Sequence, residues 1–110
     1  MTIAELKTLL ETTKLPVAYY KFPSEQEQEL PVICFVETGS NNFIADDHVY
    51  QKISSFDIEL YTVFRDTETE ASLESVLDGA DIPWEKTITY LDTELCYEVI
   101  YEIEVLIDGK

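Results

Sequence analysis

Apolar and polar residues alternate along two long segments of the chain, a spacing typical of strands with one buried face. The first segment begins at Ser54, and the second covers residues 95–107. The apolar faces would hold Phe56, Ile58, Leu60, Thr62 and Phe64 in the first segment and Tyr97, Val99, Tyr101, Ile103, Val105 and Ile107 in the second. The opposite faces would hold Asp57, Glu59, Tyr61 and Val63, and Cys96, Glu98, Ile100, Glu102, Glu104 and Leu106. Both segments therefore predict long strands, each with one apolar face and one face that carries carboxylates.

Two other segments have the spacing of amphipathic helices. Thr2 and Glu5 fit a capping box ahead of apolar residues at helical spacing, so we predict a first helix that ends near Thr13. Residues 67–70 repeat the capping-box pattern at the start of a second helix, and Gly79 suits a left-handed C-cap at its end.

Three shorter segments complete the predicted fold. Residues 17–22 and 84–91 read as strands, and residues 31–37 form a near-continuous apolar run that suggests a strand covered on both faces. Residues 38–47 contain turn residues and are predicted to be a loop. The economical packing is an α+β fold, a largely antiparallel sheet of about four to five strands with two helices packed on one face. We expect one domain over residues 1–110.

The charge of the chain narrows the classes of partner. Only 7 basic residues stand against 23 acidic ones, for a net charge of −16. Binding to the phosphates of nucleic acid or to an anionic membrane is therefore disfavoured, because the chain has few cations to replace the counterions. The balance favours a basic partner or a surface that repels nucleic acid.

The two cysteines, Cys34 and Cys96, lie in apolar, strand-like runs without metal-type spacing. We expect two buried thiols, with a single disulfide as the alternative. The first residues lack the pattern of a secretory signal, and no apolar run is long enough for a membrane helix. These features favour a protein that is made and kept in a cytoplasm until it is assembled.

Candidate catalytic chemistry is limited to Asp46, Asp47 and His48, the one cluster that suggests a metal or acid–base site. Adjacent loop residues rarely converge on one metal ion, so the alternative is a solvated acidic loop. The sequence has no G-x-S-x-G motif and no glycine-rich phosphate loop. We therefore expect no enzyme, no metal and no cofactor.

Aromatic residues raise two further alternatives. A stacking platform for bases, or packing in the core or at a subunit interface, would use Trp84, Tyr90, Tyr97 and Tyr101. The lack of nearby cations favours packing. Phe43 and Ile44 follow the turn residues Asn41 and Asn42, and would dock either on their own core or on a neighbouring chain.

The carboxylates of the two long strands would form an acidic face if those strands are neighbours. The face would hold Asp57, Glu59, Glu98, Glu102 and Glu104. Like charges on adjacent strands destabilise a sheet. Either these groups are solvated and interleaved with Lys or Thr, or the cost is tolerated because the surface must present negative potential.

The whole architecture resembles the small tail terminator proteins of long-tailed bacteriophages, also called tail completion or head–tail joining proteins. The segments that carry the resemblance are VAYYKF, PVICFVE, FDIELYTVFRDTETEASLESVL and WEKTITYLDTELCYEVIYEIEV. The resemblance implies a non-enzymatic ring, usually hexameric, that caps the tail tube in the virion and docks it to the head connector. Its partners would be other copies of itself, the tail tube protein and the head-completion or connector protein, with no membrane, while DNA passes through the lumen without specific binding.

Under this resemblance, the carboxylates Asp57, Glu59, Glu98, Glu102 and Glu104 are expected to face the lumen and repel DNA. Contacts to the tube or an adjacent subunit are expected from the predicted loop, through Asn41, Asn42, Phe43 and Ile44. The alternatives are an acidic DNA-mimic inhibitor, another acidic protein-binding module, and an enzyme that uses the Asp46–His48 cluster.

Overall fold

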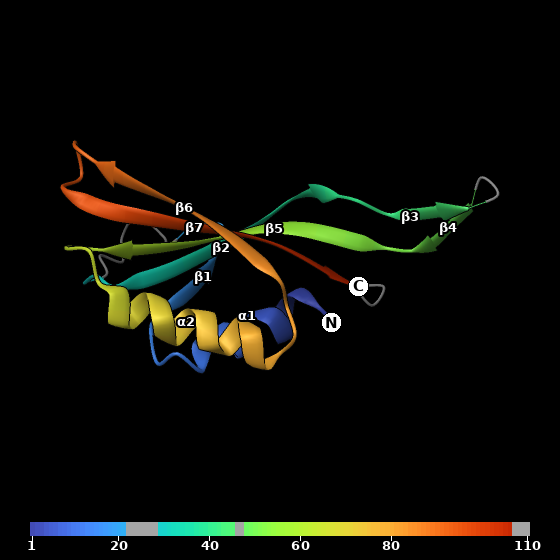
Figure 1. Cartoon of the computed structure of the whole chain (residues 1–110), viewed down its shortest axis with the longest axis horizontal. Coiled ribbons are helices and arrows are strands. Elements are labelled where there is room, and N and C mark those ends of the chain that lie inside the picture. The colour runs from blue at the N-terminus through green and yellow to red at the C-terminus, as the bar shows by residue number, and fades with distance from the viewer. Residues whose placement is uncertain (22–28, 46–47, 107–110) are drawn as a thin grey trace.

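A sheet with two helices on one of its faces forms the body of the protein (Figure 1). The computed structural model describes residues 1–21, 29–45 and 48–106. Its helices are α1 (Ile3–Glu11) and α2 (Thr67–Gly79). Its strands are β1 (Val17–Tyr19), β2 (Val32–Ser40), β3 (Phe43–Ala45), β4 (His48–Gln51), β5 (Ile53–Thr62), β6 (Trp84–Leu91) and β7 (Cys96–Leu106).

Within these described residues, five strands form the main sheet in the order β1-β2-β5-β7-β6. β1 runs parallel to β2, and each other neighbouring pair in this sheet is antiparallel. The predicted α+β class, with a mostly antiparallel sheet and two helices, is therefore confirmed. The order also places β5 directly beside β7, so the two segments with alternating patterns are neighbours.

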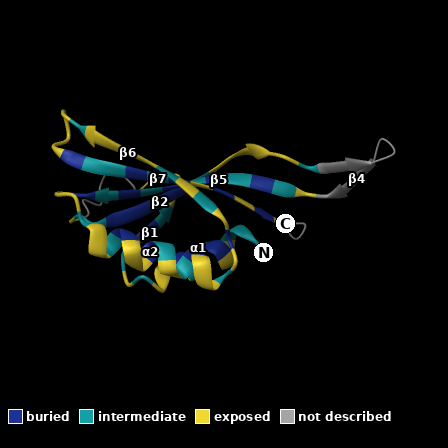
Figure 2. Cartoon of the chain, in the orientation of Figure 1, coloured by how far each residue is buried: buried dark blue, intermediate teal, exposed yellow. Residues whose placement is uncertain are grey.

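The core fills the space between the sheet and the helices (Figure 2). Burial alternates along β5 and β7 as the sequence predicts, with the even residues of β5 and the odd residues of β7 facing the helices. The centre of the core is formed by Leu6, Leu10, Phe35, Phe56, Ile58, Leu60, Leu73, Leu77, Val99 and Tyr101. Phe64 is an exception to the prediction, because β5 ends at Thr62 and the Phe64 side chain is 63% exposed.

The first helix, α1, begins where its sequence pattern predicts and ends slightly earlier. The capping box at Thr2 is confirmed: Thr2 N donates to Glu5 Oε1 at 2.8 Å, and Glu5 N donates to Thr2 Oγ1 at 3.1 Å. The helix ends at Glu11, slightly before the predicted end near Thr13, and Lys14 turns the chain with a positive φ of 72°.

The limits of α2 differ from the prediction by small shifts. The N-cap is Asp66 rather than Thr67, because the Asp66 carboxylate accepts from Thr69 N at 3.1 Å. The prediction of a left-handed cap at Gly79 was wrong: Gly79 is the last helical residue, and Asp81 takes the left-handed conformation with φ of 58°. A cap at Thr67 would accept from Glu70 N, but Glu70 N donates to the Asp66 carbonyl oxygen at 3.0 Å, so the helix begins one residue earlier than the capping-box pattern indicates.

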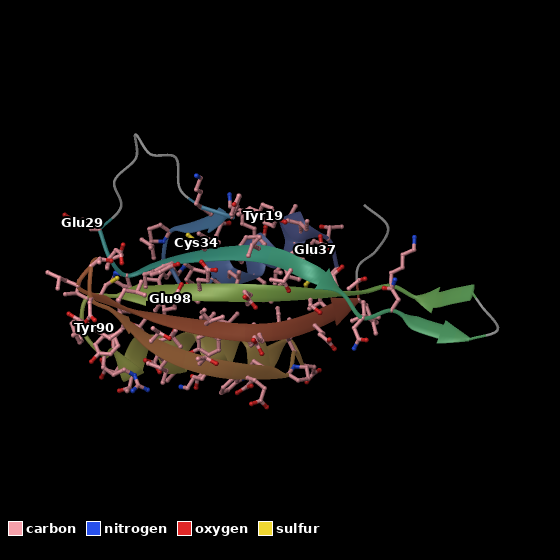
Figure 3. All side chains as sticks on the ribbon, turned by 90° about the horizontal axis from the view of Figure 1, so that it is seen from above. Tyr19, Glu29, Cys34, Glu37, Tyr90 and Glu98 are labelled. Atoms are coloured by element: carbon pink, nitrogen blue, oxygen red, sulfur yellow. The ribbon has the colours of Figure 1, made fainter. Side chains whose placement is uncertain are left out.

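The predicted loop over residues 38–47 was also wrong, because most of this segment is strand. β2 continues to Ser40, and β3 then pairs with β4 as a separate antiparallel two-stranded sheet. The turn residues lie at a bulge in β2 and at the junction between β2 and β3. We call β3 and β4, together with junction residues 41, 42 and 52, the arm. Figures 1 and 3 show the arm extending from one end of the body.

Strands are present in each of the predicted segments 17–22, 31–37 and 84–91. β1 stops at Tyr19 instead of Phe22, since Tyr20 has a positive φ of 75°. β2 is buried on both faces over residues 32–35, as the apolar run indicated. Cys34 and Cys96 are buried thiols. Among the helices described, none combines the length and the apolar character that crossing a bilayer requires.

Candidate functional site

Carboxylates gather on the face of the sheet that the described helices leave uncovered (Figure 3, which labels Glu98 on this face). In the strand register, Asp57 of β5 is opposite Glu102 of β7, and Glu85 of β6 is opposite Glu102 on its other side. These carboxylates therefore make a row across three adjacent strands. We call the set Asp57, Glu59, Glu85, Glu98, Glu102 and Glu104 the acidic face.

Glu85 was missed by the sequence reasoning, although the signal was present. The alternation in WEKTITYL separates Glu85, Thr87 and Thr89 from Trp84, Lys86 and Ile88. The hairpin register with β7 then places Glu85 on the same face as Glu102. Reading β6 in register with β7 would have found this residue.

The acidic face has no cation interleaved along its strands. In the described strands β5, β6 and β7, Lys86 is the one basic residue, and its register partner is the buried Tyr101 on the helix side. Thr87 and Thr89 share the acidic side of β6. Interleaving with threonine is therefore found, whereas interleaving with lysine is not.

A hollow of about 640 Å³ lies over one end of the acidic face. Its lining includes Asp57, Glu85, Glu102 and Glu104, with Thr38 and Ser55 beside them. Glu104 accepts hydrogen bonds from Asn41 Nδ2 at 3.2 Å and from Ser55 Oγ at 3.4 Å. The surface is thus both concave and negative, a shape that strengthens the local potential.

The other end of the acidic face contains a shared hydrogen bond. The Tyr61 hydroxyl lies 2.8 Å from Glu59 Oε1 and 2.8 Å from Glu98 Oε2. One hydroxyl hydrogen serves one carboxylate at a time, so the second contact is fully satisfied when a carboxyl group itself holds a proton. Burial raises the pKa of Glu59, the charges of Glu98 and Asp57 raise it further, and the Tyr61 hydrogen bond only partly opposes this.

This arrangement gives a pH-dependent prediction for Glu59→Gln. Because the folded pKa of Glu59 is raised above 4.5, its contribution to stability is complete below that value and is lost as pH rises through the folded pKa. We expect the wild type to gain stability relative to Glu59→Gln as pH falls from neutral toward 4.5. Urea unfolding at constant ionic strength measures this difference, with the helix variant Glu68→Gln as the control. A wild-type advantage that grows toward neutral pH would contradict the shared-proton arrangement.

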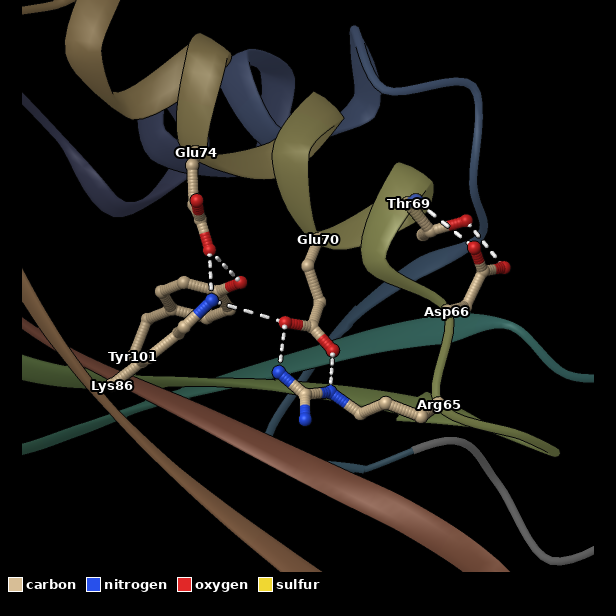
Figure 4. A network of polar contacts seen from close by, with 7 residues as sticks. All are labelled: Arg65, Asp66, Thr69, Glu70, Glu74, Lys86 and Tyr101. Atoms are coloured by element: carbon tan, nitrogen blue, oxygen red, sulfur yellow. Dashed lines mark hydrogen bonds and ion pairs between the residues drawn. The ribbon is translucent and has the colours of Figure 1, made fainter.

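A different polar network lies between the sheet and α2 (Figure 4). Glu70 is 2% exposed and accepts from Arg65 Nε at 2.7 Å and from Lys86 Nζ at 3.0 Å. Lys86 Nζ also lies 2.6 Å from Glu74 Oε2, which accepts from the Tyr101 hydroxyl at 2.8 Å. The hydrogen bond from Arg65 and the charge of Lys86 hold the pKa of Glu70 below its ordinary value despite burial. This network ties α2 to β6 and β7, and local sequence patterns had placed Glu70 in a capping box instead.

Of the residues predicted to form the interface loop, two lie at the base of the arm and two lie in its strand β3. Asn41 and Asn42 form its base: Asn41 N donates to Ile53 O at 2.9 Å, and Ile53 N donates to Asn42 Oδ1 at 3.0 Å. Phe43 and Ile44 lie in β3, whose backbone pairs with β4. Asn41 also contacts Glu104, so the arm begins where the acidic face ends.

The structure describes the other candidate groups only in part. Asp46 and Asp47 lie outside the described residues, and His48 begins β4. Across the described part of the chain, no group of three or more His, Cys, Asp or Glu residues is arranged to hold a metal ion. The predicted aromatic platform is divided, because Tyr101 is buried against Trp84 while Tyr90 packs against Tyr97 near the β6–β7 turn.

The described residues therefore present two features that could contact other molecules, the concave acidic face and the projecting arm. The polar network around Glu70 stabilises the body. A comparison of the chain with models of protein families and with curated proteins finds no match.

Proposed function

We propose that this chain is a non-catalytic structural protein of a bacteriophage particle, a tail terminator that caps the tail tube as a ring and joins it to the head connector. The acidic face lines the channel through which DNA passes. The observation that carries the proposal is the row Asp57–Glu102–Glu85, in which carboxylates on adjacent strands oppose one another without an interleaved cation.

Such a row lowers the stability of the sheet, because like charges directly opposite one another repel. Replacing the central carboxylate with a neutral residue would remove that cost, yet the chain places Glu102 there. A requirement for negative potential explains the placement, and a channel for a polyanion is one setting with that requirement.

The physical effect in a channel is to prevent adhesion. DNA carries about one negative charge per 1.7 Å of its axis and binds surfaces whose cations release its counterions. A carboxylate surface offers no such exchange. At a Debye length of about 8 Å a single carboxylate acts only at short range. A ring repeats each carboxylate in every subunit, and a narrow concave lumen focuses their field.

The proposal places the protein at the head–tail junction of the virion, with the host cytoplasm as the site of its assembly. Its partners are other copies of itself, the tail tube protein and the head-completion or connector protein. The fold supports this role, because one sheet face is covered by helices while the acidic face and the arm remain available for contacts.

The test uses particles assembled with the double variant Glu102→Lys, Glu104→Lys. Both side chains are exposed, and reversing Glu102 removes its repulsion with Asp57 and Glu85, so the variant is expected to fold. We expect normal tailed particles by electron microscopy. Infectious titre and DNA release should fall by about tenfold or more, because lysines in the channel bind phosphates.

The matched control is Glu11→Lys, Glu68→Lys, which makes the same change of charge on exposed helix positions. It should leave titre unchanged. Equal titres for both variants would remove the channel role of the acidic face. Absence of the wild-type protein from the head–tail junction, measured by antibody labelling of purified particles, would remove the tail terminator proposal. A monomer that instead binds a basic protein tightly would favour the DNA-mimic alternative.

A further inference from the structure

Exposed apolar side chains gather at the end of the sheet that lies opposite the arm. Phe64 is 63% exposed and Leu95 is 68% exposed, and Val63, Ile88 and Tyr90 are also exposed. The strand register brings these positions together, since Thr62, next to Val63, is paired with Tyr97, and Tyr97 is paired with Tyr90. We call the set Val63, Phe64, Ile88, Tyr90 and Leu95 the end patch.

Leu95 combines two unfavourable features. Its side chain is largely in solvent, and its backbone has a positive φ of 54°. Glycine or asparagine adopts that conformation more easily than leucine does. An exposed leucine with a strained backbone gains nothing for the isolated fold, so the side chain is better explained by a contact with another molecule.

The arm, in turn, would be stabilised by a surface to pack against. β3 and β4 form a two-stranded sheet outside the five-stranded one. A two-stranded hairpin is at best marginally stable in water, and a further packing surface would stabilise it. The sequences of β3 and β4, FIA and HVYQ, contain apolar residues.

The arm and the end patch lie at opposite ends of the molecule, whose longest extent is 49 Å (Figures 1 and 3). The arm therefore cannot reach the end patch of its own chain. A second copy of the chain presents the same end patch to the arm, and the two surfaces differ from one another. A contact between them is heterologous, the type of contact that generates rings.

We propose that the arm of one copy docks on the end patch of the next copy, in a head-to-tail arrangement. This rests on the proposed ring and names the surfaces that meet in it. Because each copy carries a net charge of −16, mutual repulsion opposes association while apolar burial favours it. Association is therefore strengthened by salt, which screens the repulsion, whereas an interface built on ion pairs would be weakened.

The experiment measures self-association by sedimentation velocity at low and high salt. The patch variant is Phe64→Ser, Leu95→Asn, and asparagine suits the positive φ at residue 95. The matched control is Tyr20→Asn, since Tyr20 is also exposed with a positive φ and lies outside the end patch. We expect the patch variant to associate about tenfold or more weakly than the wild type, and the control to associate equally well.

A mixing test identifies the partner surface. The arm variant Phe43→Ser, Ile44→Ser replaces two apolar residues of β3 with polar ones. Each variant alone should remain monomeric. An equal mixture should form dimers and no larger species, because the intact arm of the patch variant meets the intact end patch of the arm variant.

A mixture that stays monomeric, or a patch variant that associates like the wild type, would overturn the proposed contact. The same holds for a wild type that remains monomeric at about millimolar concentration in high salt. These results are separate from the proposed function, which depends on the location of the protein in particles. Wild-type protein at the head–tail junction without arm-to-patch association would sustain the function and reject the contact.

Discussion

Replacing Tyr101 with alanine is expected to lower the free energy of unfolding by about 3–5 kcal/mol, the range for large aromatic residues removed from a core. Tyr101 is fully buried on the helix side of β7. Its ring meets Trp84 edge to face with centroids 5.6 Å apart, and its hydroxyl donates to Glu74 at 2.8 Å. Alanine would remove the packing and the hydrogen bond together and leave a cavity between the sheet and α2.

Tyr101→Phe separates these contributions. Phenylalanine keeps the ring and removes only the hydroxyl, and Glu74 retains Lys86 as a partner. We expect this variant to cost about 1 kcal/mol. Urea unfolding of both variants with a common slope measures the two values. Equal losses for the phenylalanine and alanine variants would contradict the core position of this ring.

The parts of the fold that sequence alone predicts are those in which local pattern and tertiary packing agree. Burial alternates along residues 53–62 and 99–106, and their apolar faces have a helix layer to bury them. The capping box at Thr2 is likewise local, because donor and acceptor lie within one turn. In such segments the nearest neighbours in sequence are sufficient to specify the structure.

The arm was not predictable in the same way. Its strands are short, and they are strands because β3 and β4 pair with each other, which no single segment reveals. The residues before them, Gly39 to Asn42, have the composition of a turn, and this local signal outweighed the weak strand signal. Pairing between segments can override local propensity, and short strands show this most clearly.

The candidate site also has a part that the sequence predicts and a part that it does not. Alternation alone assigns Asp57, Glu98 and Glu102 to one side of their strands, and the strand order supplies their proximity. The network around Glu70 needed tertiary information, since Arg65 and Lys86 come from different segments. The pairing with Lys86 across the sheet and helix layers has no local sequence signal.

The two faces of the sheet treat carboxylates differently, and this contrast bears on function. On the helix side, Arg65 and Lys86 compensate Glu70. On the acidic face, Glu102 stands between two other carboxylates. A chain with few cations thus places two of them where burial makes an unpaired charge costly. The exposed face remains negative, which is the condition that a DNA-repelling surface requires.

The second large effect is expected from removing the compensated carboxylate itself. Glu70→Ala should lower the free energy of unfolding by about 2 kcal/mol, less than for a fully buried ion pair, because the freed cations can reach water. The Arg65 side chain is 41% exposed, and Lys86 is 26% exposed and keeps Glu74. The loss should be largest for Glu70→Ala and smaller for Glu70→Gln, which keeps the volume and one hydrogen-bond acceptor.

The stability difference between wild type and Glu70→Gln should also depend on pH. Because the folded pKa of Glu70 is depressed, its stabilising contribution is present above 4.5 and is lost as pH falls through the lower folded pKa. The difference between wild type and Glu70→Gln should therefore shrink as the solution is acidified below that value. Glu59 has the opposite sign: because its folded pKa is raised, its contribution grows as pH falls through that folded pKa, above 4.5. Unfolding of wild type, Glu59→Gln and Glu70→Gln across acidic pH measures both trends. A Glu70→Gln deficit that persists unchanged in acid would contradict a stabilising contribution from the ionised carboxylate.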